Sequence, residues 1–347
     1  MDFNAELGFR IGLLQKRLEE DGLSAALVTS KENILYLTGK ETGRLLVTRD
    51  GAYLWVKDLY KQLYSGLYSS RRYPIKVLVY RKDYVKKFLA KHRVKVLMVD
   101  TASVASHKNL RAELSTKIVL KSFVEEQRAI KSRYEIGLLK KSCGIASEGM
   151  KAAEDVVEKG VREIDAVAEI EKRIRTLGSE TPPFNDGMLL ASGPRGADIH
   201  ARASCSRIGR GLVVVDLGAK YKGYYSDMTR TLPVGGLIRR ERVLLEFVEN
   251  LKDETIDSLK HGVVAGEVHK SVEDALKARG FDFYHSSGHG VGLQIHEKPN
   301  IGPESKDVLK EGMVFTIEPG IYVPRKYGIR FEDTVLLTKK GCRRLTG

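Results

Sequence analysis

The apolar run Val213-Val-Val-Asp216 closes on an acid, and a second acid, Asp227, follows eleven residues later in Tyr225-Ser-Asp-Met-Thr-Arg-Thr231. Between them, the stretch Ala219-Lys-Tyr-Lys-Gly223 is suited to a reversal of the chain. This pattern predicts two antiparallel strands that carry one acid on each arm. Because successive side chains of a strand point to opposite faces, the two acids can be directed at one shared point.

A second stretch in the last third of the chain repeats this arrangement. The apolar run Met313-Val-Phe-Thr-Ile-Glu318 ends on an acid, and Glu332 follows 14 residues later in Arg330-Phe-Glu-Asp-Thr334. Between the two pairs lies His289, in Ser287-Gly-His-Gly-Val-Gly-Leu293, where the flanking glycines indicate close approach of another backbone. The two pairs therefore echo each other, and scattered surface charge does not account for them.

Taken together, these five side chains predict a dinuclear metal site. Four carboxylates balance two divalent cations, and a histidine adds a nitrogen ligand. Burying four acids without cations would be prohibitive, because like charges repel strongly in a low dielectric. Singly, Asp216 could cap a turn and Asp227 could be an exposed strand charge. An oxygen-rich site favours Mn²⁺, Co²⁺ or Fe²⁺ over Zn²⁺.

The chain, at 347 residues, is long enough for two domains. Residues 1–122 alternate short apolar runs with amphipathic stretches, which predicts an α/β domain. From residue 123 the pattern changes to long helical segments separated by strands and Gly-rich turns. We therefore expect a second domain over residues 123–347. Its predicted helices span about 124–159 (with Gly137 and Gly144 inside it), 163–177, 239–260 and 266–279.

Charge is unevenly distributed along the chain, whose formal net charge is +14. Residues 51–123 hold 16 Lys+Arg and four Asp+Glu. A nucleic-acid surface is one interpretation, but no RNA-binding or helix-turn-helix signature accompanies the charge, so a solvated face is favoured. No apolar run approaches bilayer-spanning length, so we expect no membrane partner. Three cysteines without Cys-x-x-Cys spacing are expected to be reduced thiols of a cytoplasmic protein.

Four motifs resemble those of the metallopeptidases that include Xaa-Pro dipeptidase (prolidase), aminopeptidase P and methionine aminopeptidase. They are Asp216-Leu-Gly with Ser226-Asp-Met-Thr-Arg-Thr231, Gly288-His-Gly-Val-Gly-Leu-x-x-His-Glu297, Thr316-Ile-Glu-Pro-Gly320 and Arg330-Phe-Glu-Asp-Thr334. The resemblance implies a pita-bread catalytic domain of α+β class, whose two halves are related by pseudo-twofold symmetry.

Motifs in the N-terminal domain favour one branch of these metallopeptidases. Asn33-Ile-Leu-Tyr-Leu-Thr-Gly39 is similar to the creatinase-type domain that prolidases and aminopeptidase P carry, and Arg128-Ala-Ile-Lys-Ser132 resembles the start of the helix that follows it. Methionine aminopeptidase lacks this domain, which favours the proline-directed branch. An α/β creatinase-like domain preceding the pita-bread domain is thus expected.

The resemblance also implies roles for the four acids and the histidine. Asp216 and Asp227 would hold one metal ion, while His289 and Glu318 would complete the site of the other. Asp227 and Glu332 would contact both ions. Glu318 is in addition the candidate catalytic acid–base, which would move a proton from water to the leaving nitrogen.

Five further residues resemble pocket positions of the family. His296 and His200 are expected to contact substrate and stabilise the oxyanion of the tetrahedral intermediate. Arg330 shares a strand face with Glu332 and would orient a ligand carboxylate. His285 is either a pocket residue or an ordinary surface histidine, and Tyr322 either lines the pocket or belongs to the core.

Substrate choice is less well defined by the sequence. Prolidases commonly place an arginine for the dipeptide carboxylate where this chain has Asn300, and Arg195 or Lys298 could substitute for it. We expect an Xaa-Pro dipeptidase that forms a homodimer and acts on proline-containing peptides. The alternatives are an aminopeptidase acting on longer Xaa-Pro peptides or with broader specificity, and a pita-bread protein that binds without cleaving.

Overall fold

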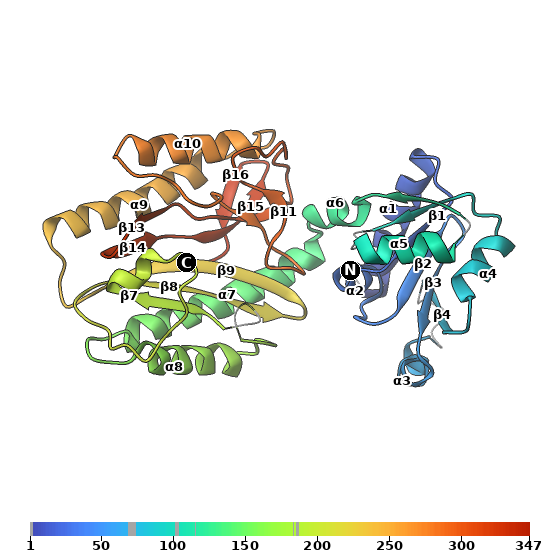
Figure 1. The fold of residues 1–347 in the computed structure, drawn as a ribbon, viewed down its shortest axis with the longest axis horizontal. Coiled ribbons are helices and arrows are strands. Elements are labelled where there is room, and N and C mark those ends of the chain that lie inside the picture. Colours follow the sequence, from blue (N-terminus) through green and yellow to red (C-terminus); the bar gives the residue numbers. More distant parts are fainter. Residues whose placement is uncertain (1–2, 69–73, 101–103, 115, 183, 185–186) are drawn as a thin grey trace. The chain divides into compact units, whose positions relative to one another are not determined.

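The computed structural model describes all residues except 1–2, 69–73, 101–103, 115, 183 and 185–186 (Figure 1). The chain divides into two compact units, Met1–Arg128 and Ala129–Gly347. The change of unit falls within α6 (Phe123–Ala129), the helix at whose first residue we placed the domain boundary. No helix in the described part of the chain is long and apolar enough to cross a bilayer.

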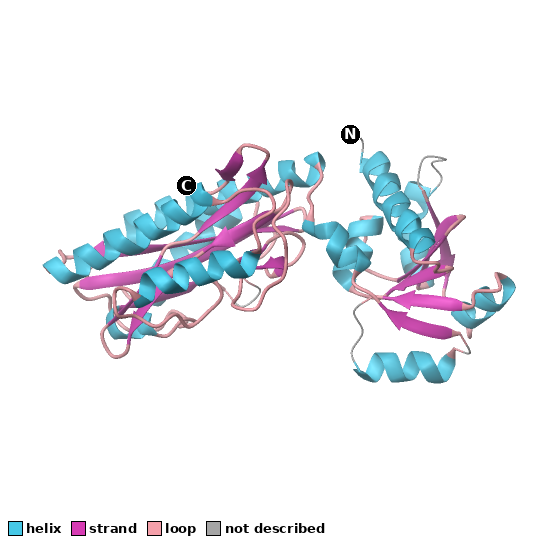
Figure 2. Cartoon of the chain, turned by 90° about the horizontal axis from the view of Figure 1, so that it is seen from above, coloured by secondary structure: helices cyan, strands magenta, loops and turns pink. Residues whose placement is uncertain are grey.

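The first unit is an α/β layer structure built on a six-stranded sheet of order β4-β3-β2-β1-β5-β6. β1 pairs antiparallel with β2 and β2 with β3, whereas the β3–β4, β1–β5 and β5–β6 pairs are parallel. Figure 2 shows strands of this unit lying between helices. The strands are β1 (Ala25–Val28), β2 (Arg44–Thr48), β3 (Gly51–Val56), β4 (Ile75–Val79), β5 (Val96–Val99) and β6 (Lys117–Leu120), and the helices are α1 (Phe3–Glu20), α2 (Lys31–Thr38), α3 (Asp58–Tyr68), α4 (Tyr84–Lys91) and α5 (Val104–Glu113).

In its described residues, the second unit contains three sheets and four α-helices. The sheets have the orders β7-β8-β9, β11-β10-β12-β15-β16 and β13-β14, with antiparallel pairing throughout the described ladders. The helices are α7 (Arg133–Val156), α8 (Glu163–Thr176), α9 (Arg239–Ser258) and α10 (Ala265–Lys277), with a 3-10 helix η1 (Gly193–Ala197). The strands are β7 (Leu189–Ser192), β8 (Gly211–Tyr221), β9 (Tyr224–Val234), β10 (His289–Gly290), β11 (Glu297–Asn300), β12 (Val314–Ile317), β13 (Gly320–Val323), β14 (Tyr327–Arg330), β15 (Asp333–Thr338) and β16 (Gly341–Arg344).

Each half of this unit is a strand hairpin covered by two helices. Apolar side chains of α7 and α8 pack on β8 and β9, as in the contact of Ile145, Ile170 and Val213. Those of α9 and α10 pack on the strands of the second half, as Val248, Val272 and Ile329 do in one cluster. Figure 1 shows the two helix pairs on opposite sides of the strands. The predicted echo between the halves therefore extends from the strands to the helices.

The first hairpin differs from the sequence prediction at its acid. Asp216 does not end its strand, because β8 continues through Tyr221 and the reversal is the two-residue turn Lys222-Gly223. Both turn residues have positive φ, 48° and 84°, which is the geometry of the tight turns that join twisted antiparallel strands. Asp216 thus lies opposite Thr229 in the middle of the ladder, inside the unit.

The second hairpin is interrupted where the first is continuous. β12 pairs with β15 up to Ile317 opposite Asp333, and β13 pairs with β14 from Gly320 opposite Arg330. The breaks between these ladders are Glu318-Pro319 and Phe331-Glu332, so both acids leave the regular sheet at the same level. Glu332 instead forms a bridge to Thr229 of β9, which joins the two hairpins.

The long helix predicted over 124–159 is split, though not at its internal glycines. It breaks at 130–132, between α6 and α7, because the Lys131 backbone N donates to Gly312 O (2.9 Å) instead of to a helical carbonyl. Ser132 then begins α7 in a capping box with Glu135. The hydrophobic periodicity within one segment does not reveal this strand-like contact with Gly312, 181 residues away.

Candidate metal centre

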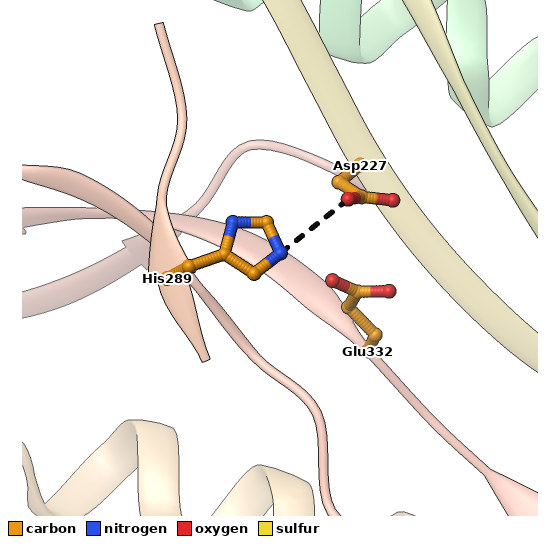
Figure 3. Close-up of side chains that lie close together, drawn as sticks. All are labelled: Asp227, His289 and Glu332. Atoms are coloured by element: carbon orange, nitrogen blue, oxygen red, sulfur yellow. Dashed lines mark ion pairs between the residues drawn. The ribbon is translucent and has the colours of Figure 1, made fainter. Parts of the chain in front are cut away.

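The five predicted ligands come from five different places in the second unit and converge on one region. Asp216 lies on β8, Asp227 on β9 and His289 on β10, while Glu318 follows β12 and Glu332 precedes β15. Figure 3 shows Asp227, His289 and Glu332 facing one another, and each offers a ligand atom within 4.8 Å of those of the other two. His289 Nε2 lies 3.6 Å from Asp227 Oδ2 and 3.5 Å from Glu318 Oε1.

The carboxylates lie close enough to disturb one another's ionisation. Burial raises the pKa of Asp227 well above its usual value, and the charges of Glu332 and Asp216 raise it further. Burial likewise raises the pKa of Glu332, with the charges of Glu318 and Asp216 adding to the effect. The pKa of Glu318 is raised to about 8, mainly by burial. Such a cluster requires a positive counter-charge to stay ionised near neutral pH.

Three carboxylate oxygens lack a hydrogen-bond partner among the described residues although they are buried: Asp216 Oδ1, Asp227 Oδ1 and Glu332 Oε1. A buried acceptor without a partner costs roughly 1–3 kcal/mol, so three in one cluster are not accounted for by the protein alone. Hard divalent cations bind oxygen ligands of this kind. The residues present therefore fit divalent cations.

His289 is arranged as a neutral nitrogen donor. Burial, and then the charge of His296, lower the pKa of His289 to about 3. Its Nδ1 lies 3.2 Å from Gly290 O, which identifies Nδ1 as the protonated nitrogen and leaves Nε2 with a free lone pair facing the acids. The flanking glycines permit this placement, because a Cβ at Gly288 would overlap Thr316 O and one at Gly290 would overlap Lys298 O.

Arg330 connects the acids to the pocket residues. It bonds Asp216 Oδ2 through Nη2 (2.6 Å), Tyr322 Oη through Nη1 (2.9 Å) and Thr229 Oγ1 through Nε (3.2 Å). Tyr322 Oη is also 2.8 Å from His285 Nε2. Since His285 Nδ1 lies 2.8 Å from Ser286 O and donates there, Tyr322 donates to Nε2 and accepts from Arg330. This chain of bonds fixes one oxygen of Asp216, Oδ2, and leaves Oδ1 without a hydrogen-bond partner among the described residues.

Thr229 contacts one of the acids, Glu332, although no sequence pattern singled it out. Its Oγ1 donates to Glu332 Oε2 over 2.7 Å. Thr229 follows Asp227 by two positions on β9, so the same strand alternation that relates the acids could have identified it.

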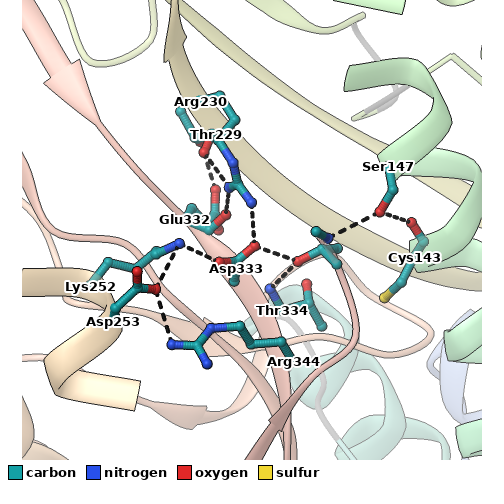
Figure 4. Close-up of polar contacts among 12 residues, drawn as sticks. Cys143, Ser147, Thr229, Arg230, Lys252, Asp253, Glu332, Asp333, Thr334 and Arg344 are labelled. Carbon is teal, nitrogen blue, oxygen red and sulfur yellow. Dashed lines mark hydrogen bonds and ion pairs between the residues drawn. The ribbon is translucent and has the colours of Figure 1, made fainter. Parts of the chain in front are cut away.

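Asp333 is a second residue that the sequence patterns did not single out, and it is charged. Its buried carboxylate accepts hydrogen bonds from Arg230 Nη2 (2.7 Å), Lys252 Nζ (2.6 Å) and Thr346 Oγ1 (2.9 Å). Figure 4 shows the contacts with Arg230 and Lys252. It directly follows Glu332, so this network anchors the strand that presents a predicted ligand.

The two predicted substrate histidines, His200 and His296, are exposed. The His296 ring meets the His289 ring edge to face, with centroids 4.1 Å apart. A charge on His200 would lower the pKa of both His285 and His296, which places His200 within electrostatic reach of both.

Both basic side chains that could replace the missing arginine, Arg195 and Lys298, are paired with acids. Arg195 Nε lies 3.2 Å from Glu163 Oε2, and Lys298 Nζ lies 3.6 Å from Asp307 Oδ1. Asn300 is exposed on β11. Prolidases commonly bind the carboxylate of the dipeptide with an arginine. None of these three residues therefore supplies a free positive charge for that carboxylate.

Comparison with known proteins assigns both units. The sequence matches metallopeptidase family M24 over residues 137–339 and the creatinase/prolidase N-terminal domain over residues 10–130. The chain is 35% identical to the Xaa-Pro dipeptidase of Pyrococcus furiosus over 346 residues, which is 97% of either chain.

Solved structures agree with this assignment. The prolidase from P. furiosus superposes with a TM-score of 0.87 at 34% identity, covering 96% of this chain and 99% of that one. An X-Pro aminopeptidase from Thermotoga maritima superposes with a TM-score of 0.86 at 26% identity over 97% of each chain. The predicted creatinase-like domain followed by a pita-bread catalytic domain is thereby confirmed. The chain belongs to metallopeptidase family M24 and carries an N-terminal domain of the creatinase/prolidase type.

Proposed function

We propose that this protein is a dinuclear metal-dependent exopeptidase that hydrolyses the Xaa-Pro bond, in the first place as an Xaa-Pro dipeptidase. The observation that carries the proposal is the set of three buried, unpartnered carboxylate oxygens, two of which belong to Asp227 and Glu332, the acids grouped with His289. The Xaa-Pro dipeptidase from P. furiosus, similar over 97% of the chain, supports the substrate class.

The proposed ligands of two divalent cations are Asp216, Asp227, His289, Glu318 and Glu332. Mn²⁺, Co²⁺ or Fe²⁺ are favoured over Zn²⁺ because four of these five ligands are carboxylates. When bound, such a pair supplies Lewis acidity and a nucleophilic water at neutral pH.

The protein's own residues would handle the protons and the substrate. Glu318 is the proposed catalytic acid–base, since it stands beside His289 Nε2 and also receives a weak hydrogen bond from Thr316 Oγ1 (3.4 Å). His296, which meets the His289 ring, and the exposed His200 are proposed to donate hydrogen bonds to the oxyanion. Arg330 would hold Asp216, while Tyr322 and His285 would hold Arg330.

A second candidate function is an aminopeptidase acting on longer Xaa-Pro peptides or with broader specificity. Two observations favour this candidate. Arg195 pairs with Glu163 and Lys298 pairs with Asp307, and Asn300 carries no charge. A site without a free cation for the carboxylate of a dipeptide would also accept substrates in which the chain continues beyond proline. The similar X-Pro aminopeptidase from T. maritima is consistent with this candidate.

Three peptides separate the candidates. Met-Pro, Met-Pro-Ala and Met-Ala would be incubated with the protein and Mn²⁺ or Co²⁺, and the released amino acids would be quantified. Cleavage of Met-Pro alone is the result expected for the dipeptidase. Release of Met from Met-Pro-Ala would establish the aminopeptidase, and additional cleavage of Met-Ala its broader form. No cleavage with either metal would overturn the peptidase proposal and favour a binding module.

We further propose a cytoplasmic homodimer. The free thiols of Cys143, Cys205 and Cys342 suit a reducing compartment. A molecular mass near 39 kDa by light scattering would contradict the dimer.

A further inference from the structure

The segment 192–204, between β7 and β8, carries His200 and is held at both ends by one buried carboxylate. Glu163, the first residue of α8, is fully buried. Its Oε1 accepts hydrogen bonds from Ser192 N (2.9 Å) and Ser192 Oγ (2.8 Å) at the start of the segment. Its Oε2 accepts from Ser204 N (3.0 Å) and Ser204 Oγ (2.7 Å) at the end. Arg195, inside the segment, gives the fifth bond, from Nε over 3.2 Å.

Five donors on one carboxylate define its charge state. Burial raises the pKa of Glu163, but the hydrogen bonds from Ser192 and Ser204 outweigh this, so that its pKa lies below the usual value. Glu163 is therefore an anion under neutral conditions. A carboxylate can accept all five bonds, whereas an amide in its place would turn an N–H₂ toward backbone N–H donors.

The middle of the same segment touches the candidate metal centre. Gly196 is buried against the backbone of Gly328 on β14, where a Cβ on Gly328 would overlap Gly196 O. Arg330 Nη1 lies 3.4 Å from Ile199 O, the carbonyl directly before His200. The segment is thus fixed by Glu163 on one side and by the arginine of the metal centre on the other.

We propose that Glu163 is a positioning residue: by closing the segment 192–204, it determines where His200 stands relative to His285 and His296. Its effect on catalysis rests on the proposed peptidase function, whereas its effect on the order of the segment does not. We call the five hydrogen bonds to Glu163 the clamp. Arg195 takes part in the clamp and also bonds Arg202 O, which explains why it is not free for a substrate carboxylate.

A role confined to the helix itself is the competing explanation. An acid in the first turn of a helix is favourable wherever it points, because of the helix dipole. Asp165 provides the matched control, since it lies in the same turn, is exposed, and bonds Arg162 (2.7 Å) rather than any residue of 192–204. Each end of the segment has a second anchor, since Ser192 pairs with Val213 in the β7–β8 ladder and Ile164 N donates to Ser204 O, so loss of the carboxylate should free the residues between the two ends most.

The first measurement is amide hydrogen exchange of the full-length protein, which needs no substrate. In Glu163→Gln, exchange across 192–200 should accelerate roughly tenfold or more, while Asp165→Asn leaves it unchanged. Equal exchange in wild type and Glu163→Gln would overturn the clamp. Equal acceleration in both variants would also overturn it, in favour of a general helix effect.

The second measurement is a double-mutant cycle with His200→Ala, using whichever peptide the wild type cleaves fastest. Glu163→Gln alone should lower kcat/KM by about 10- to 100-fold at unchanged metal content, because misplacing a reacting group has effects of this size. In the His200→Ala background the same substitution should change kcat/KM by less than about twofold. If the effects of the two substitutions on kcat/KM are fully additive, the proposal that Glu163 acts through His200 is overturned. An inactive wild type would overturn the proposed function alone, since the exchange experiment still decides the clamp.

Discussion

Arg330 Nη2 and Asp216 Oδ2 lie 2.6 Å apart with both side chains buried, although the two residues are 114 positions apart in the chain. The pair links the second hairpin to the first beside the candidate metal centre. It satisfies one oxygen of Asp216 and leaves the other, Oδ1, as one of the unpartnered acceptors. This single bond therefore determines which oxygen of Asp216 would remain available to a cation.

Replacing Arg330 should weaken metal binding without removing a ligand. In Arg330→Met, Asp216 loses its orienting partner, and we expect metal affinity to fall by about 10- to 100-fold. Isothermal titration of the metal-free protein with Mn²⁺ measures this directly. Arg210→Met is the control, because Arg210 forms a half-exposed pair with Glu241 away from the acids. Equal affinities for wild type and Arg330→Met would contradict the assignment.

Glu318→Gln should retain the fold and lose most activity. The amide keeps the size of the side chain but can no longer accept a proton from water, so kcat should fall by about 10²- to 10⁴-fold. Circular dichroism and steady-state hydrolysis of Met-Pro provide the two readouts. Turnover at the wild-type rate would refute the role of Glu318, whatever the effect on metal binding.

Chelation should destabilise the wild type more than a variant that lacks one buried acid. Cations that bind the folded state raise its stability by mass action, and their removal leaves the acids facing one another. We expect Tm to fall on addition of EDTA and to recover with Mn²⁺. Metal-free Asp227→Asn should melt no lower than metal-free wild type, and added Mn²⁺ should stabilise it less. A wild-type Tm that changes neither with EDTA nor with Mn²⁺ would argue against a metal site formed by these residues.

Asp333→Asn should be strongly destabilising even though Asp333 is not a proposed ligand. It would leave Lys252 buried without its closest anionic partner, at a cost of about 3–5 kcal/mol in the free energy of unfolding. Urea denaturation compares this variant with Asp253→Asn, whose carboxylate contacts the same lysine from a half-exposed position. A similar small loss in both variants would mean that the Asp333 network contributes little.

Much of the candidate site could be predicted because its residues follow local rules. Strand alternation and the repeated pattern of apolar run, acid and turn identify Asp216, Asp227, Glu318 and Glu332, and the flanking glycines single out His289. The helices α8, α9 and α10 likewise begin and end close to where hydrophobic period and glycine caps predict.

What the sequence did not reveal depends on partners far along the chain. Thr229 acquires its importance from Glu332, 103 residues away, and Asp333 from Lys252, 81 residues away. Glu163 resembles an ordinary acid in the first turn of a helix until Ser192 and Ser204 fold onto it. Such contacts depend on how separate segments meet, and no periodicity within one segment encodes them.

The central claim is that two cations held by these five residues drive hydrolysis of an Xaa-Pro bond. The most direct test is to titrate metal-free protein with Mn²⁺ or Co²⁺ while measuring free proline released from Met-Pro. Our account predicts that proline release rises with metal and reaches a plateau at about two equivalents per chain. Proline release that is unchanged by EDTA, or that never appears at any metal loading, would contradict it.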